Sequence, residues 1–174
     1  MIKLSDNIIL REMTNNDYSL VYNWVQNDFV YKWFEQRVLS LDEVISKYEK
    51  KINNKNQVVM IIEYNNKPIG LLQYYKYKDS KKYLENYNNI YEYDLFIGEK
   101  SYLSKGLGSI IINSFNDYLF NELKCDCIIL RPLKDNDRAS NCYKKCGFDL
   151  LYEYNDLDTI GNNRIFQVYK KSVF

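Results

Sequence analysis

Histidine is absent from the 174 residues of this chain. A Ser-His-Asp triad, a Cys-His dyad and a metal site with imidazole ligands are therefore excluded. Proton transfer falls to carboxylates, tyrosine, cysteine, lysine, the N-terminus or water. The charges nearly cancel, because 24 side chains are basic and 23 are acidic. This balance gives no global electrostatic case for binding nucleic acid or a membrane, and we expect neither partner.

Glycine and proline are scarce, at six and two residues. A chain that uses so little glycine is expected to place each one where the backbone needs it. Gly106 and Gly108 stand close together in the sequence. No apolar run reaches the length of a membrane span, and residues 1–14 are too interrupted by charge for a secretion signal. We therefore expect a cytoplasmic protein.

Four cysteines stand at positions 125, 127, 142 and 146. Their spacing is poor for zinc, and no histidine can complete a ligand set. Cys142 and Cys146 lie one helical turn apart, where reduced cysteine packs as a small hydrophobic side chain. We favour packing over a metal site and predict no metal.

The residues that are present predict one folded domain spanning residues 1–174. The apolar fraction is 46%, and the 18 tyrosines and 8 phenylalanines need burial. Seven segments have the pattern of strands: residues 8–12, 58–64, 69–77, 91–97, 128–130, 148–154 and 164–170. Helices are expected after Thr14, around 29–34, from Ser40 to about Lys51, from about 110 to 119, and from 136 to 146. This order predicts an α/β (α+β) fold with a mixed central sheet of about six to seven strands flanked by helices.

A loop before the fourth helix has the pattern of a phosphate site. Its sequence is Ser-Lys-Gly-Leu-Gly-Ser at 104–109, and an apolar helical run follows. Such a loop presents free backbone N–H groups at the positive end of a helix dipole. The P-loop pattern is absent and the dinucleotide fingerprint is incomplete. Alone, the two glycines fit a tight turn equally well.

The charges around this loop are unevenly distributed. Residues 83–99 hold four acids and no base, whereas residues 100–148 hold eight bases and five acids. One site could therefore face a cation on one side and a polyphosphate on the other. A solvated run of charges is the alternative.

Four segments together carry a family resemblance. They read Y-E-Y-D-L-F-I-G-E at 91–99, S-K-G-L-G-S at 104–109, I-L-R-P at 129–132 and N-D-R-A-S-N-C-Y-K-K-C-G-F at 136–148. In this order they resemble the GCN5-related N-acetyltransferase (GNAT) superfamily, with a closer likeness to the aminoglycoside 6′-N-acetyltransferases. The resemblance implies the GNAT fold with its splayed central strand, acetyl-CoA as the donor, and direct transfer to a primary amine in a ternary complex.

The resemblance also implies which residues bind the donor. Backbone groups of Phe96 and Ile97 would hold the pantetheine and polarise the thioester carbonyl. Asn136 would bond the pantetheine arm, and Tyr143 would protonate the departing thiolate. The pyrophosphate would lie on a cradle of five residues: Lys105, Gly106, Leu107, Gly108 and Ser109.

On the acceptor side, Asp94 is the expected catalytic carboxylate. It would hold the ammonium group and accept its proton directly or through water. Glu92, two residues away on the same strand, would share its face and bind substrate. Trp33 matches an aromatic position of the family and could pack on a sugar face.

Each of these assignments has a structural alternative. Asp94 could be a solvated carboxylate at a strand end, and Tyr143 and Trp33 could be core side chains. Seven tyrosines lie between positions 74 and 93. We favour sheet packing for them over an aromatic substrate wall.

Two positions depart from the family pattern. Leu103 stands where the superfamily usually has Gln or Arg. Arg131 stands where the similar enzymes tend to carry an acid that helps bind a polycation. Arg131 would oppose a cationic acceptor, unless its side chain swings away or pairs with Asp135.

The resemblance therefore predicts 6′-N-acetylation of an aminoglycoside, with the small-molecule amine as the partner. One alternative is an acetyltransferase for another amine, such as a peptide N-terminus, a polyamine or a small metabolite. The other is a non-catalytic acyl-CoA-binding domain.

Overall fold

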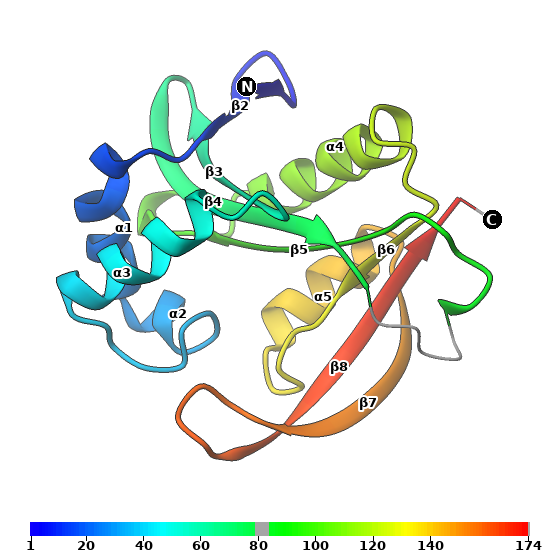
Figure 1. Cartoon of the computed structure of the whole chain (residues 1–174). Coiled ribbons are helices and arrows are strands. Elements are labelled where there is room, and N and C mark those ends of the chain that lie inside the picture. The colour runs from blue at the N-terminus through cyan, green and yellow to red at the C-terminus, as the bar shows by residue number, and fades with distance from the viewer. Residues whose placement is uncertain (79–83, 174) are drawn as a thin grey trace.

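A twisted sheet of eight strands runs through the computed structural model, which describes residues 1–78 and 84–173 (Figure 1). The strand order is β1-β2-β3-β4-β5-β6-β8-β7, and only β5 and β6 pair in parallel. The strands are β1 (Ile2–Lys3), β2 (Ile8–Glu12), β3 (Gln57–Tyr64), β4 (Lys67–Lys76), β5 (Ile90–Ile97), β6 (Cys127–Leu130), β7 (Asp149–Leu157) and β8 (Asn163–Ser172). The expected six to seven strands become eight because β1 has only two residues, too few to produce an alternating pattern.

Residues 1–78 and 84–173 also contain five α-helices. They are α1 (Tyr18–Val25), α2 (Asp28–Tyr31), α3 (Leu41–Ile52), α4 (Leu107–Asn121) and α5 (Asp137–Lys145). The capping box predicted for α3 is present: Ser40 Oγ accepts from Glu43 N at 3.2 Å, and Ser40 N donates to Glu43 Oε2 at 2.8 Å. The helix therefore begins where the sequence predicted.

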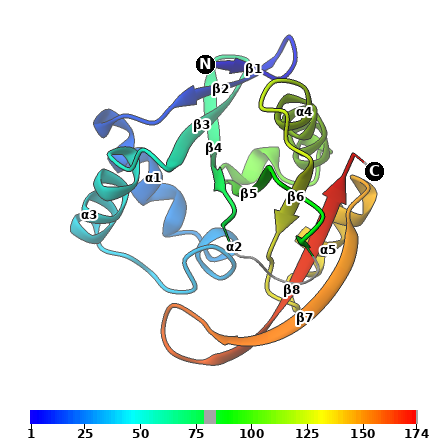
Figure 2. The ribbon, with the colours of Figure 1, turned by 45° about the vertical axis from the view of Figure 1, so that its right-hand side comes forward.

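The helices cover both faces of the sheet (Figure 2). Val59 and Ile61 of β3 pack with buried residues of α1 and α3, whereas Met60 and Ile62 pack with those of α4. This alternation is the period-two pattern of a strand buried on both faces. Each face of β3 thus has its own core.

The sheet separates between β5 and β6. Only Ile90–Glu92 of β5 pair with β6, whereas the pairing of β5 with β4 continues to Ile97. Residues 94–97 therefore expose one backbone edge beyond the last β5–β6 pair. This divergence is the splayed central strand that the resemblance implied.

Three of the six tyrosines that the structure describes between positions 74 and 93 are buried inside the protein. Tyr74, Tyr91 and Tyr93 are buried in the α4-side core, which confirms the packing interpretation for these three. Tyr83, the seventh tyrosine of this region, lies in residues 79–83, outside the described residues.

The four cysteines are free thiols, and three of them are buried. Residues 1–78 and 84–173 contain no cluster of three or more Cys, Asp or Glu side chains arranged to hold a metal ion. In the same residues, no helix has both the length and the apolar character needed to cross a membrane.

Candidate active site

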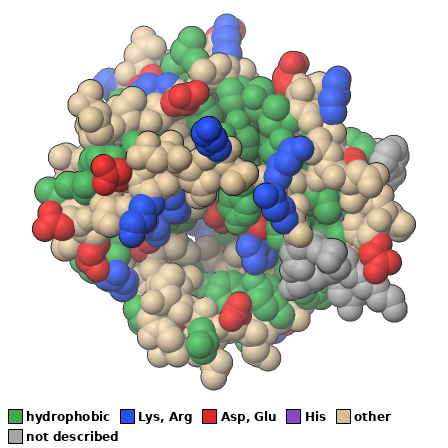
Figure 3. Space-filling view, viewed as in Figure 1, with side chains coloured by type: hydrophobic (Ala, Val, Ile, Leu, Met, Phe, Trp, Pro, Cys, Tyr) green, Lys and Arg blue, Asp and Glu red, His purple; other side chains and the backbone are tan. Residues whose placement is uncertain are grey.

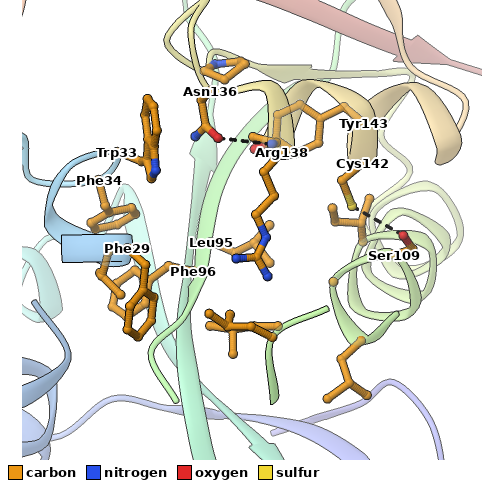
Figure 4. Close-up of a pocket in the computed structure, with 18 of the residues that line it drawn as sticks. Phe29, Trp33, Phe34, Leu95, Phe96, Ser109, Asn136, Arg138, Cys142 and Tyr143 are labelled. Carbon is orange, nitrogen blue, oxygen red and sulfur yellow. Dashed lines mark hydrogen bonds between the residues drawn. The ribbon is translucent and has the colours of Figure 1, made fainter. Parts of the chain in front are cut away.

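An open cleft of about 300 Å³ lies where β5 leaves β6. Its walls come from α2 and the turn after it, the end of β5, the start of α4 and the start of α5 (Figure 4). The space-filling view shows the hollow, with charged side chains of both signs at its edge (Figure 3). Ten predicted site residues line the cleft: Trp33, Asp94, Phe96, Ile97, Gly106, Leu107, Gly108, Ser109, Asn136 and Tyr143. Glu92 and Lys105 are the predicted residues outside its lining.

The start of α4 forms one end of the cleft. Gly106 adopts φ +78°, and a Cβ built on it would meet nothing within 4 Å. Backbone conformation rather than crowding therefore favours glycine here. In an α-helix of 15 residues, the N–H groups of Leu107, Gly108 and Ser109 have no acceptor within the helix. They can bind an anion in the cleft.

Lys105 lies beside this helix start. Its Nζ atom is 5.7 Å from the centre of the Tyr102 ring. The ammonium group therefore stands at the edge of the loop, where it adds positive charge without forming part of the cleft wall.

The start of α5 provides a second polar wall. Asn136 Oδ1 accepts a hydrogen bond from Ala139 N at 3.2 Å and so caps the helix. The amide nitrogen is then the group that Asn136 can offer to a ligand. Arg138 also points into the cleft (Figure 4), although the sequence analysis assigned it no role. The N-D-R-A run that contains Arg138 was the available indication.

The end of β5 is anchored by tight packing. A Cβ on Gly98 would lie 2.2 Å from Trp24 Cγ, so no other residue fits there. The Trp24 Nε1–H donates to Glu99 Oε1 at 2.8 Å. The Phe96 ring packs against Trp24 and Phe34, with ring centres 6.1 and 4.8 Å away. The exposed edge near Ile97 therefore belongs to a fixed segment.

The backbone groups of Phe96 face β4, because Phe96 is paired with Leu71 and Gly98 N donates to the Ile69 carbonyl. Of the two predicted residues, Ile97 is therefore the one whose N–H lies on the open edge.

Tyr143 lies on α5 beside the thiols of the same helix. Its ring packs against Phe148 and Tyr169, and its pKa is raised by burial and further by the charge of Asp94. The hydroxyl therefore keeps its proton at neutral pH. Cys142 Sγ lies 3.4 Å from Ser109 Oγ, which brings α5 into contact with the start of α4.

Asp94 lines the cleft from β5. Burial raises the pKa of its carboxyl group. A hydrogen bond from Gln73 Nε2 to Asp94 Oδ2, at 3.2 Å, opposes this rise, as do the positive charges of Lys51 and Arg131. The group is thus a carboxylate whose basicity is increased by its surroundings.

Glu92 takes part in a buried ion pair. Its side chain is 2% exposed and accepts from Arg131 Nε at 2.6 Å and Arg131 Nη2 at 2.9 Å. Burial raises the pKa of Glu92 to about 7, and the Arg131 hydrogen bonds oppose that rise. Asp135 instead pairs with Arg164 at 2.7 Å, so neither conformation anticipated for Arg131 is the one observed. Arg131 lines the cleft and neutralises Glu92 behind it.

Aromatic side chains form the wall opposite α5. Phe29, Trp33 and Phe34 come from α2 and the turn that follows it (Figure 4). Lys32 Nζ lies 4.7 Å from the centre of the Trp33 ring. Trp33 is partly buried and also lines the cleft, so it is not solely a core residue.

The turn between β7 and β8 touches the segment after α2. Thr159 N donates to Gln36 Oε1 at 2.8 Å, and Thr159 Oγ1 donates to the Glu35 carbonyl at 2.6 Å. These contacts join two segments far apart in the chain next to the aromatic wall.

A set of polar side chains between α3 and the sheet was missed by the sequence analysis. Its members are Glu35, Lys47, Tyr48, Lys51, Gln57 and Gln73. Two indications were available. Gln73 is a lone polar residue in an apolar strand, and Lys47 and Lys51 are spaced to share a helix face with Tyr48.

Comparison with known protein families finds a match that covers most of the chain. Residues 13–155 match the family described as "Acetyltransferase (GNAT) domain". The chain belongs to the GNAT acetyltransferase family. The GNAT membership that the sequence motifs implied is therefore confirmed, and the chain is an enzyme of this acetyltransferase family.

The GNAT relatives include aminoglycoside acetyltransferases and spermidine acetyltransferases. This GNAT chain is 28% identical to aminoglycoside N(6′)-acetyltransferase type 1 of Klebsiella pneumoniae over 151 residues, which cover 83% of this chain and 75% of the relative. It is 27% identical to spermidine N(1)-acetyltransferase of Vibrio cholerae over 150 residues, covering 83% and 80%.

Solved GNAT structures have the same fold. AAC(6′)-Ib in complex with paromomycin and acetyl-CoA superposes with a TM-score of 0.78 at 24% identity, covering 97% of this chain and 94% of the other. Spermidine N-acetyltransferase of Vibrio cholerae, in complex with CoA and spermine, gives a TM-score of 0.77 at 22% identity, covering 97% and 96%.

Proposed function

We propose that this GNAT enzyme transfers the acetyl group of acetyl-CoA to a primary amine, and that the acceptor is the 6′-amine of an aminoglycoside. The observation that carries the proposal is the shared cleft at the splay. Asp94 and Tyr143 both line it, one from β5 and the other from α5. A proton acceptor and a proton donor thus border the place where the exposed strand edge can hold a thioester.

In the proposed reaction, Asp94 binds the protonated amine and takes one proton, directly or through water. The neutral nitrogen attacks the thioester carbon, while the backbone N–H group of Ile97, on the open edge of β5, stabilises the negative oxygen. The C–N bond forms and the C–S bond breaks. Tyr143 gives its proton to the thiolate and recovers one, through water, from the nitrogen that has become the amide. Asp94 then releases its proton to solvent, so both residues return to their starting states.

The start of α4 supports the donor half of the proposal. Its free N–H groups and the nearby Lys105 provide positive potential for the CoA pyrophosphate. Asn136 and Arg138 offer further donors on the opposite wall. The residues present therefore fit an anionic, elongated donor.

The acceptor half is supported by a carboxylate facing an aromatic wall. Asp94 suits an ammonium group, and the rings of Phe29, Trp33 and Phe34 suit the apolar face of a sugar. The names of the relatives agree with a small amine acceptor.

Arg131 favours a second candidate acceptor. Because it lines the cleft and neutralises Glu92, it removes one anionic contact that a polycation would use. An amine with fewer positive charges, or with a carboxylate near the amine, fits this arrangement.

A panel of amines tests the acceptor. Acetyl-CoA and the purified protein are mixed with 6′-amino aminoglycosides, 6′-hydroxy aminoglycosides, spermidine, a dipeptide and a monoamine, and thiol release is followed. Turnover confined to 6′-amino aminoglycosides, with the product acetylated at that position by NMR, is expected. Turnover only with another amine would contradict the aminoglycoside assignment, and acetyl-CoA binding without turnover would contradict transfer itself.

A further inference from the structure

The side-chain amide of Gln73 forms hydrogen bonds with an ammonium group, with another amide and with the carboxylate of Asp94. Gln73 Oε1 accepts from Lys51 Nζ at 2.6 Å and from Gln57 Nε2 at 3.2 Å. On its other side, Gln73 Nε2 donates to Asp94 Oδ2 at 3.2 Å. Gln73 is itself buried in β4, and its Cα is paired with that of Asp94 across the sheet.

We propose that Lys51 and Gln57 fix the side-chain amide of Gln73 in one orientation, so that Gln73 always donates to Asp94 and positions it as a carboxylate. Gln73 is then a positioning residue for the acceptor proton transfer. The inference rests on the proposed function, because Gln73 affects catalysis in this way only if Asp94 accepts the proton of the acceptor amine.

The orientation follows from the donors available. A protonated lysine has three donors and no acceptor, so the Gln73 atom that faces Lys51 must be the oxygen. The opposite orientation would place an NH₂ group against Lys51 and a carbonyl oxygen against the Asp94 carboxylate. Two hydrogen bonds would become two repulsive contacts, each beside partly or fully buried groups.

The amide orientation also decides which form of Asp94 is stabilised. A donor at Oδ2 favours the carboxylate, whereas a carbonyl at the same place favours the protonated acid. Because burial already raises the pKa of Asp94, loss of the Gln73 donor would raise it further. A protonated Asp94 can no longer accept the proton of the ammonium group.

Other charged groups act on the same site from every element packed around it. The helix α3 contributes Lys47, Tyr48 and Lys51, and α5 contributes Tyr143. The sheet contributes Tyr75 from β4, Glu92 from β5 and Arg131 from the end of β6. Within the described residues, Gln73 is the one side chain that donates a hydrogen bond to Asp94. Its removal should therefore change the titration of Asp94 without altering the fixed charges.

Lys51 is well held for this role. Its ammonium group lies 5.4 Å from the centre of the buried Tyr48 ring. Tyr48 OH donates to Glu35 Oε1 at 3.3 Å, and Lys47 forms an ion pair with Glu35. The helix face that carries Lys51 is thus fixed against the sheet.

The test is the pH dependence of kcat/KM, measured with whichever amine the panel identifies. Gln73→Met removes the amide, Gln73→Glu keeps the shape and the acceptor for Lys51 but removes the donor, and Lys51→Met frees the amide to turn. Lys51→Arg retains the charge and donors. Lys50→Met, the same change at the exposed neighbouring position of α3, is the matched control.

We expect the acid limb to move up by about one pH unit in Gln73→Met and Lys51→Met, and further in Gln73→Glu, where two carboxyl groups would meet. The limb should stay in place in Lys51→Arg and Lys50→Met. The rate on the plateau should fall by less than about threefold, because Asp94 is still a carboxylate there. An unmoved limb in Gln73→Met and Gln73→Glu would overturn the inference, whatever happens to the plateau.

Two further measurements keep the outcome clear. The ¹³C signal of the Asp94 carboxyl group reports its pKa in any folded variant, active or not, and should shift with the kinetic limb. If Asp94→Asn retains wild-type turnover, the proposed function fails. If Asp94→Asn is inactive but the Asp94 pKa is the same in wild type and Gln73→Glu, the positioning role alone fails.

Discussion

The two halves of the cleft differ in the chemical groups that form them. The donor half consists mainly of backbone: the N–H groups at the start of α4 and the open edge of β5 at residues 94–97. The acceptor half consists of buried and half-buried side chains, including Asp94 with Gln73 and Lys51, and Glu92 with Arg131. Backbone groups keep their position when side chains change, whereas a side-chain network depends on every member.

This difference teaches where specificity lies. A helix start and a splayed strand suit any acyl-CoA donor of the same shape, so the donor half can be shared across a family. The acceptor preference can be altered by one substitution in the acceptor half, and Arg131, beside Glu92, is a position where this is expected. Four variants test this division, from the largest expected effect to the smallest.

The strongest test of the acceptor half is Asp94→Asn. The amide cannot accept the proton of the ammonium group, so kcat/KM should fall by about 10²- to 10³-fold. The Kd of acetyl-CoA, measured by calorimetry, should be unchanged because the donor half does not use Asp94. Asp117→Asn, an exposed change on α4, is the matched control. A parallel loss of acetyl-CoA binding would show that the two halves are not separate.

Arg131→Ala should change which acceptor is preferred. Removal of the guanidinium exposes Glu92 to the cleft but also removes the hydrogen bonds that oppose the burial-raised pKa of this group. At alkaline pH, where Glu92 is a carboxylate and attracts cations, the ratio of kcat/KM for a polycation to that for a monoamine should therefore rise by about tenfold. The double variant Arg131→Ala with Glu92→Gln should restore the wild-type ratio. Equal ratios in the single and double variants would contradict a role for the ion pair in selectivity.

Gly106→Ala tests the donor half. At φ +78°, alanine is strained and costs about 1 kcal/mol, which should shift the start of α4. The KM for acetyl-CoA should rise by about three- to tenfold, while the KM for the amine stays constant. Gly161→Ala is the matched control, since Gly161 has φ +85° and similar free space in the β7–β8 turn. The same kinetic change in both variants would indicate general strain.

The smallest expected effect is a change in stability, and Lys51→Met measures it. Burial lowers the pKa of Lys51 from 10.5 to about 8 in the folded protein. Between those two values the unfolded chain binds more protons than the folded chain, so unfolding becomes less favourable as the pH rises. The free energy of unfolding of the wild type should therefore rise relative to Lys51→Met between pH 8 and 10, by about 1–2 kcal/mol. Denaturant titrations at several pH values measure this difference, and a constant difference would contradict burial of the charged amine.

Local patterns predicted most of the helices and strands. The capping box at Ser40, the glycine pair at 106 and 108, and the alternation of β3 depend on neighbours in the chain, so the helix and strand boundaries emerged within a few residues. The eighth strand was missed because Ile2–Lys3 is recognisable only by its pairing with β2.

The acceptor half depends on contacts between distant residues. The Arg131–Glu92 pair requires the parallel register of β5 and β6, and no local pattern distinguishes it from the pair with Asp135. Of the four acids in residues 83–99, Asp94 is the one that lines the cleft. Glu99 accepts a hydrogen bond from Trp24, and Glu92 accepts from Arg131. The network behind Asp94 joins α3 to β4, a contact that sequence spacing alone does not specify.

The pH dependence of kcat/KM in wild type and Asp94→Asn tests the central claim most directly. If Asp94 accepts the proton of the amine, the wild-type profile has an acid limb at a pKa above the ordinary aspartate value, because burial raises the pKa of this carboxyl group. Activity is then lost as the pH falls through that pKa, and the residual activity of Asp94→Asn lacks the limb. The same acid limb in Asp94→Asn would contradict the account.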